Sequence, residues 1–138
     1  MCKDIWYEVK STVSGAESVK ITSIEQVDVQ TPGELVIVYL DSTSRSDNER
    51  ISLNSIFKEV YNLLSSEVLK NKLSSALLGL GYYTRPEYDQ YCFKYSKTER
   101  YLVDKNFPCV RRTDIPSAVI SSSYELSVSS INNNLIRN

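Results

Sequence analysis

The segment IWYEVKS, residues 5–11, decides how the rest of this chain is interpreted. Its apolar residues recur at every second position, which is the period of a β-strand with one face in the core. Glu8 and Lys10 stand two residues apart and therefore point to the same side of that strand. The alternation predicts that Val9 faces the core behind them, and that the two charged residues lie together on the other side.

The segments that follow indicate a sheet. Turn residues around Gly15 lead into SVKITS, residues 18–23, which alternates again and predicts an antiparallel hairpin with residues 4–11. A short helical turn is expected over residues 23–28. ELVIVYL, residues 34–40, is apolar on both faces, which is typical of a central strand.

The middle of the chain predicts two helices, and the last third predicts further strands. Apolar residues at three- and four-residue spacing begin after Ser52, a typical N-cap residue. The second helix follows directly and ends before Gly81, which suits a left-handed C-cap. Two strands, residues 88–96 and 99–104, would be joined by the polar turn SKTE. We therefore expect an α/β fold, a mixed β-sheet with flanking helices, in a single domain over residues 1–138.

The composition excludes several kinds of chemistry. The 138 residues include no histidine, which excludes nucleophiles activated by histidine and histidine-ligated metals. Cys2, Cys92 and Cys109 are far apart and form no CxxC pair, so we interpret them as reduced thiols. The net charge of −1 supplies no overall basic field, so DNA binding would have to be local, weak alone, or helped by a partner.

Membrane and export signals are not evident in the sequence. No apolar run approaches the roughly 20 residues that span a bilayer. A secretory signal has a charged segment followed by an apolar one, and the first residues of this chain do not show that pattern. We therefore expect a cytoplasmic protein that makes no membrane contact.

The Glu-x-Lys spacing at residues 8–10 is a weak signal by itself. With 17 acidic residues and nine lysines, about one acid-x-Lys tripeptide is expected by chance, and one is found. Its position on a strand adds meaning, because a glutamate ligates a hard cation such as Mg²⁺ through oxygen and a neighbouring lysine orients the attacking water. The alternative is a solvent-facing ion pair on an edge strand.

The order of short motifs along the chain resembles one family. From Glu8 to about Val128, it is similar to the bacterial PD-(D/E)XK motif proteins found in restriction and phage-defence gene clusters. The motifs that carry the resemblance are, in chain order, YEVKST, ITSIEQVD, LLGLGY, RYLVDKNFP, DIP and YELS.

The resemblance implies a restriction-endonuclease-like fold and hydrolysis of DNA phosphodiesters that depends on Mg²⁺ or Mn²⁺. It makes Glu8 a metal-ligating and catalytic acid, Lys10 the catalytic lysine, and the carbonyl of Val9 a further metal ligand. It also implies that Gln26, in a short helix after the strand, helps to place the attacking water or the substrate.

One landmark of the family is missing from this sequence. The first acidic ligand lies on the preceding strand in the superfamily, whereas only seven residues precede Glu8 here. The resemblance therefore implies the C-terminal portion of a longer family member, with a core that lacks its N-terminal elements and a weak or absent metal site. The unpaired edge of its first strand would then pair with a second copy or with a partner defence subunit.

Arg111 and Arg112 form the main local concentration of positive charge. Two adjacent arginines are suited to DNA phosphates, and we expect them to contact nucleic acid. The alternative is a solvated turn between Pro108 and Pro116.

The sequence leaves two alternative functions open. The first is a Mg²⁺-dependent DNA phosphodiesterase of the restriction or defence type, or its C-terminal fragment. The second is a non-catalytic interaction or accessory module of a DNA-defence system. The strand with Glu8 and Lys10 favours the first, and the missing acid favours the second.

Overall fold

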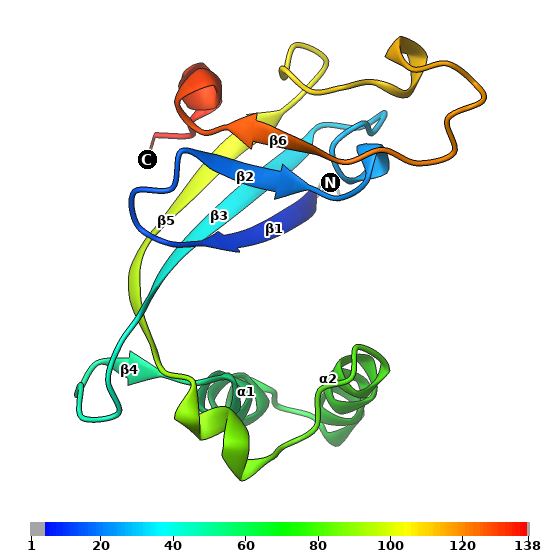
Figure 1. Ribbon diagram of the computed structural model, residues 1–138. Helices are drawn as coiled ribbons and strands as arrows, with labels where there is room; N and C mark the ends of the chain where they lie inside the picture. Colours follow the sequence, from blue (N-terminus) through cyan, green and yellow to red (C-terminus); the bar gives the residue numbers. More distant parts are fainter. Residues whose placement is uncertain (1–4, 138) are drawn as a thin grey trace. The chain divides into compact units, whose positions relative to one another are not determined.

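The computed structural model describes residues 5–137 (Figure 1). Contacts between residues divide the chain into two compact units. The first unit holds the residues up to Leu40 and those from Ser96 onward, and the second unit holds Asp41–Tyr95. The single domain expected over residues 1–138 stays a prediction.

A mixed four-stranded sheet is the largest β element. Its strands follow the order β1-β3-β5-β4, with the bounds Trp6–Thr12, Gly33–Ser42, Phe93–Val103 and Arg50–Ile51. β1 runs parallel to β3, whereas β4 runs antiparallel to the first residues of β5. The expected α/β class, with a mixed sheet and helices, is confirmed.

A second sheet of two strands completes the core of the first unit. β2 (Ser18–Ile21) and β6 (Tyr124–Ser127) pair antiparallel and cross over β3 and β5 in Figure 1. Apolar side chains from both sheets lose contact with water between them, which drives this packing. The buried apolar residues of the two sheets are Val19, Ile21, Leu35, Ile37, Tyr39, Tyr101, Val103 and Leu126.

The predicted hairpin between the first two strands is wrong. β2 is a strand as expected, but it pairs with β6, while β1 pairs with β3. The turn between them contains Gly15 at a φ of +78°, a conformation that glycine adopts without steric cost. This turn leads the chain out of one sheet and into the other, which allows Val19 and Ile21 to enter the core.

The two faces of β1 are the reverse of those expected. Ile5, Tyr7 and Val9 are exposed over 47%, 54% and 60% of their surface. The prediction that Val9 faces the core is therefore wrong. Glu8 and Lys10 belong to the partly buried face of the strand.

Trp6 explains why this face turns inward. Its side chain packs against the core, and its indole N–H donates to the Thr31 carbonyl oxygen at 2.7 Å. Gly33 lies opposite Trp6 in the parallel pair, and a Cβ atom at Gly33 would overlap the indole ring. The absence of a side chain at Gly33 therefore makes room for the largest residue of β1.

The predicted turn SKTE is wrong, because β5 continues through these residues as one strand. The Glu99 carboxylate accepts hydrogen bonds from the hydroxyl groups of Tyr39 and Tyr101, at 2.8 and 2.9 Å. These bonds hold the polar stretch in an extended conformation. Residues 88–90, which were expected to begin this strand, belong instead to a 3₁₀ turn, Pro86–Gln90.

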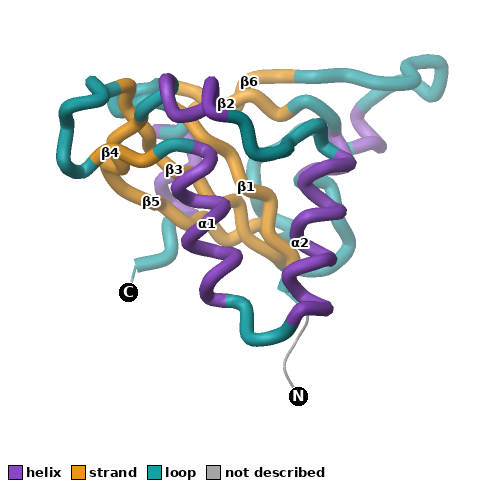
Figure 2. The backbone as a smooth tube through the Cα atoms, turned by 90° about the horizontal axis from the view of Figure 1, so that it is seen from below, coloured by secondary structure: helices purple, strands orange, loops and turns teal. Residues whose placement is uncertain are grey.

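Both predicted helices are present in the second unit. α1 is Leu53–Leu63, and its N-cap Ser52 accepts a hydrogen bond from the N–H of Ser55 at 3.2 Å. α2 is Glu67–Gly79, and Gly81 follows at a φ of +84°. Figure 2 shows the two helices joined at one end by a short turn.

Four 3₁₀ turns complete the described elements. They are η1 (Ile24–Gln26), η2 (Pro86–Gln90), η3 (Arg112–Asp114) and η4 (Ser129–Asn134). Among residues 5–137, no helix is long and apolar enough to cross a membrane.

Candidate active site

The inner face of β1 brings charged residues to the margin of the core. Glu8 lies opposite Leu35 and Lys10 lies opposite Ile37, and residues opposite each other in a parallel pair share one face of the sheet. Leu35 and Ile37 are fully buried. The side chains of Glu8 and Lys10 keep only 21% and 15% exposure, so this pair is not the solvent-facing ion pair of the alternative interpretation.

Lys10 contacts both of the other residues that the resemblance implies are catalytic, Glu8 and Gln26. Its Nζ lies 3.0 Å from Glu8 Oε1 and 2.9 Å from Gln26 Oε1. The same amide oxygen accepts a hydrogen bond from the backbone N–H of Thr22 at 2.9 Å. Because both neighbours are donors, the amide must present its oxygen to them. Residues that are 16 positions apart in sequence therefore meet here, while their catalytic roles stay predictions.

Local sequence explains how Gln26 reaches Lys10. Ile24 and Val27 are fully buried and anchor the η1 turn on the core. Gln26 lies between these two anchors and is partly buried. Apolar residues three apart on a tight turn therefore leave the intervening polar residue available to β1.

Glu8 is the carboxylate that would hold a cation at this site. Within residues 5–137, no group of three or more His, Cys, Asp or Glu side chains is placed to bind a metal ion. Mg²⁺ in proteins is usually held by one or two carboxylates together with substrate phosphates and water. Binding of a cation by Glu8, and the carbonyl of Val9 as a further ligand, stay predictions.

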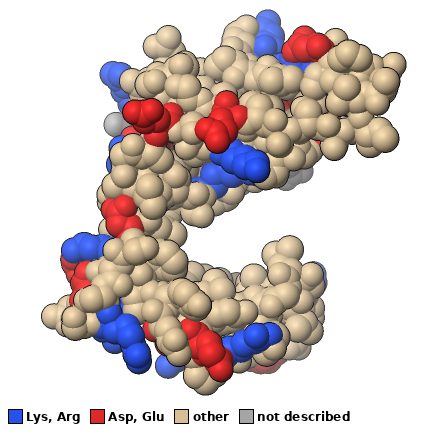
Figure 3. All heavy atoms as spheres, viewed as in Figure 1, with Lys and Arg blue, Asp and Glu red and all other residues tan. Residues whose placement is uncertain are grey.

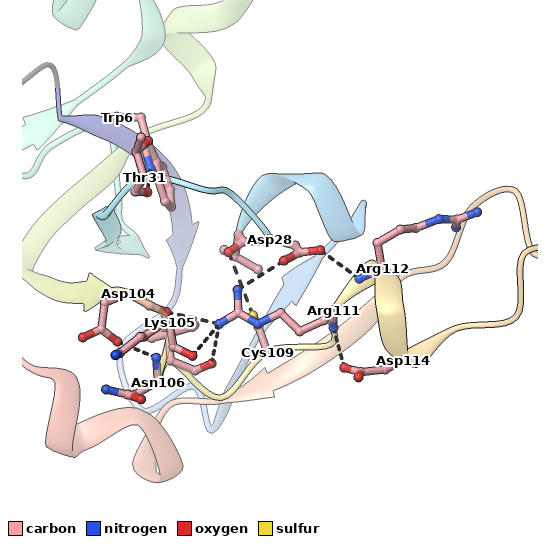
Figure 4. Close-up of polar contacts among 12 residues, drawn as sticks. Trp6, Asp28, Thr31, Asp104, Lys105, Asn106, Cys109, Arg111, Arg112 and Asp114 are labelled. Atoms are coloured by element: carbon pink, nitrogen blue, oxygen red, sulfur yellow. Dashed lines mark hydrogen bonds and ion pairs between the residues drawn. The ribbon is translucent and has the colours of Figure 1, made fainter.

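Arg111 and Arg112 have partners within the protein. The Arg111 guanidinium binds Asp28, with Nη1 3.2 Å from Oδ1, and Arg112 Nη1 donates to the Val119 carbonyl oxygen at 2.7 Å. Figure 4 shows the two side chains directed to opposite sides of their segment. The contact of these arginines with DNA stays a prediction.

Charge on the surface is mixed in sign. On the face drawn in Figure 3, basic and acidic side chains are interspersed over both units. This distribution agrees with the net charge of −1 and gives DNA no extended basic surface on that face.

Asp28 is the residue near the site that sequence reasoning missed. It lies two residues after the end of η1, and its two carboxylate oxygens accept from Arg111 Nη1 and from the Arg112 N–H. An aspartate after a short turn is common in loops, so its partners more than 80 residues later leave no local signal.

A family model matches most of this chain. Residues 2–129 match the family described as "Putative PD-(D/E)XK family member, (DUF4420)". No curated protein and no solved structure matches the chain. The matched residues include Glu8, Lys10 and Gln26.

Proposed function

Because the chain belongs to this family of PD-(D/E)XK-like proteins, we propose that it hydrolyses DNA phosphodiester bonds with Mg²⁺ or Mn²⁺. The observation that carries the proposal is the meeting of Glu8, Lys10 and Gln26 on the inner face of β1. The mixed α/β sheet is consistent with the nuclease-like core of such a family. The proposed setting is restriction or phage defence in the cytoplasm.

The partial burial of the Glu8–Lys10 pair supports a functional role. Moving two charges out of water costs free energy that an ion pair only partly recovers, and apolar residues of similar volume often pack at least as well. Leu35 and Ile37 beside the pair show that this face accommodates apolar side chains. A charged pair here adds little to stability, whereas a site for phosphate chemistry requires it.

Each residue has a defined part in the proposed reaction. Lys10 would orient the attacking water beside the phosphate, and the Gln26 amide oxygen would hold its ammonium group in place. Glu8 would be the protein ligand of the cation, which when bound polarises the phosphate and lowers the pKa of a coordinated water. In this proposal the DNA phosphate, water or a residue of another strand supplies the further oxygen ligands of the cation.

The outer edge of β1 is the place where another strand would bind. Among the described residues, β3 is the only strand that pairs with β1. The exposed side chains of Ile5, Tyr7 and Val9 add apolar surface beside this edge. The proposal is that a second copy pairs with the edge and brings a carboxylate toward Glu8. Light scattering over a range of protein concentrations tests it, and a monomer throughout would exclude the second copy and leave a partner subunit as the source.

Cleavage of supercoiled plasmid by the purified chain tests the proposed activity. With Mg²⁺ or Mn²⁺ we expect cleavage that EDTA abolishes and that Glu8→Gln lowers at least about 100-fold. Glu125→Gln on β6 is the matched control, because it makes the same chemical change at an exposed position and should cleave normally. Cleavage that survives in Glu8→Gln would contradict the proposed site.

A second candidate function is a non-catalytic interaction or accessory module of a DNA-defence system. It is favoured by one observation, that the described residues hold no cluster of metal-binding side chains. Folded wild-type protein that binds DNA in a gel-shift assay but fails to cleave it with either cation would support this second function and contradict the first.

A further inference from the structure

Asp28 ties the turn that carries Gln26 to a distant part of the chain. The backbone N–H of Asp28 donates to the Ile24 carbonyl oxygen at 3.0 Å, so Asp28 belongs to the end of the η1 turn. Its carboxylate binds Arg111 Nη1 at 3.2 Å and the Arg112 N–H at 2.8 Å. Both carboxylate oxygens are therefore engaged with the segment that begins η3.

Arg111 connects this carboxylate to the loop that follows β5. Its Nη2 donates to the carbonyl oxygens of Asp104, Lys105 and Phe107, at 3.1, 3.3 and 3.3 Å. A guanidinium group has five N–H donors in a rigid plane, which suits one side chain to several fixed acceptors. Figure 4 shows the guanidinium lying between Asp28 and this loop.

The burial of the pair indicates that it is a lasting contact. The side chains of Arg111 and Asp28 are 23% and 18% exposed, well below the exposure of a surface ion pair. Removing one partner of a partly buried pair leaves the other charge without compensation, so such pairs resist opening. The contact therefore restrains the C-terminal end of η1 more firmly than a solvent-exposed salt bridge would.

The loop after η1 is held at its other end as well. Trp6 on β1 donates to the Thr31 carbonyl oxygen at 2.7 Å. Residues 28–31 therefore lie between two attachment points, one at Asp28 and one at Thr31 (Figure 4). The turn just before this loop presents Gln26 to Lys10.

We propose that Asp28 and Arg111 are positioning residues of the candidate active site, which hold η1 so that the Gln26 amide oxygen meets Lys10. The catalytic role of this site rests on the proposed function, whereas the coupling between Arg111 and Gln26 rests on contacts alone. Arg111 acts through Asp28 and has no direct role on DNA. For Arg111, a contact with Asp28 thus takes the place of the expected contact with a DNA phosphate.

Arg112 provides a matched control beside Arg111. Its backbone N–H binds Asp28, but its guanidinium donates to the Val119 carbonyl oxygen and does not contact Asp28. Arg112→Ala therefore removes the same charge while it keeps the backbone hydrogen bond. If the two arginines instead serve DNA phosphates as a pair, both alanine variants should weaken DNA binding alike and reduce its salt dependence.

The test is the side-chain amide signal of Gln26 in ¹⁵N-labelled full chain, identified by its loss in Gln26→Leu. Arg111→Ala and Asp28→Asn should move this signal in the direction that Lys10→Met moves it, and Arg112→Ala should leave it in place. Arg111→Lys keeps the charge opposite Asp28 and should restore part of the wild-type shift. Asp28→Asn, which preserves an acceptor for the Arg112 N–H, supplies the result if Arg111→Ala does not fold.

Two results would overturn the proposal. One is a Gln26 signal that stays in place in both Arg111→Ala and Asp28→Asn, and the other is an equal displacement in Arg112→Ala. Where wild-type cleavage is measurable, Arg111→Ala should lower kcat about tenfold with KM for DNA unchanged. A wild-type chain that cannot cleave DNA but shows the expected Gln26 shifts would refute the proposed function and leave the coupling standing.

Discussion

Two strands of the first unit each carry a glutamate and a lysine two residues apart, but the two ion pairs have different surroundings. On β1, Lys10 Nζ lies 3.0 Å from Glu8 Oε1. On β5, Lys97 Nζ lies 2.6 Å from Glu99 Oε1. The spacing and the contact are nearly the same, so the remaining partners of each pair must distinguish what the pairs do.

In the β1 pair the lysine is the more buried partner, and in the β5 pair it is the more exposed one. The Lys10 side chain is 15% exposed and also binds the Gln26 amide. The Lys97 side chain is 54% exposed and lies 4.7 Å from the centre of the Tyr39 ring. An exposed lysine contributes little to stability, whereas a partly buried ammonium held by two oxygens has a more restricted position.

The two carboxylates differ in the same way. Glu99 accepts from Lys97 and from the hydroxyl groups of Tyr39 and Tyr101, which join it to the core. Within residues 5–137, Glu8 binds Lys10, and this leaves lone pairs of its carboxylate for a further ligand. The same Glu–Lys spacing therefore contributes to core packing in β5, whereas in β1 it leaves the Glu8 carboxylate available to bind a further ligand.

The largest predicted effect on stability is at Glu99. Glu99→Leu should lower the free energy of unfolding by about 3 kcal/mol, because two hydroxyl groups at the core lose their acceptor. Glu8→Leu should cost less, about 1 kcal/mol, because the Lys10 ammonium keeps the Gln26 amide oxygen as its partner. Urea unfolding of both variants measures the difference, and equal losses would remove the distinction between the pairs.

At high pH, the stability should depend on the two tyrosines that donate to Glu99 of the β5 pair. Burial, together with the hydrogen bond to Glu99, raises the pKa of Tyr39 to about 12 from 10.0, and the pKa of Tyr101 is raised for the same reasons. A pKa raised by folding gives stability that is complete below pH 10 and is lost as the pH rises toward about 12. We expect urea unfolding to show a loss of stability between these values that is smaller in Tyr39→Phe; an unchanged slope in that variant would contradict this assignment.

The smallest predicted effect is at Lys97. Lys97→Met should change the free energy of unfolding by about 0.5 kcal/mol, because the ammonium is half exposed and the two tyrosine hydroxyl groups still bind Glu99. The matched comparison is Glu99→Leu in the same urea experiment. A loss in Lys97→Met as large as that in Glu99→Leu would mean that the ion pair, and not the hydroxyl groups, holds this part of the sheet.

Local signals predicted the elements that depend on neighbouring residues. Ser52 and Gly81 marked the ends of the two helices because capping is decided within one turn. The apolar run of β3 identified the central strand of the larger sheet. These local signals can be interpreted without knowing which part of the protein the segment packs against.

Pairing and orientation could not be predicted from such patterns. Alternation in β1 separates two faces without stating which is buried, and the contact of Trp6 with Gly33 and Thr31 decides it. The partner of β2 is β6, more than 100 residues later, where no local signal operates. The polar stretch of β5 stays extended only because Glu99 meets two tyrosines from the core.

The candidate site was predicted in part, and through resemblance more than through pattern. Chance accounts for about one Glu-x-Lys tripeptide in such a chain, so spacing could not select Glu8 and Lys10. The family likeness added Gln26, and the structure places its amide oxygen 2.9 Å from Lys10 Nζ. The attachment of this turn through Asp28 and Arg111 required the fold.

The most direct test of the difference between the two pairs is plasmid cleavage by Lys10→Met and Lys97→Met, measured beside their urea unfolding. Both changes remove one ammonium from a Glu–Lys pair of the same spacing in the same unit. We predict that Lys10→Met remains folded and loses at least about 100-fold in cleavage, while Lys97→Met cleaves as the wild type does. Equal cleavage by the two folded variants would contradict a catalytic role for the β1 pair.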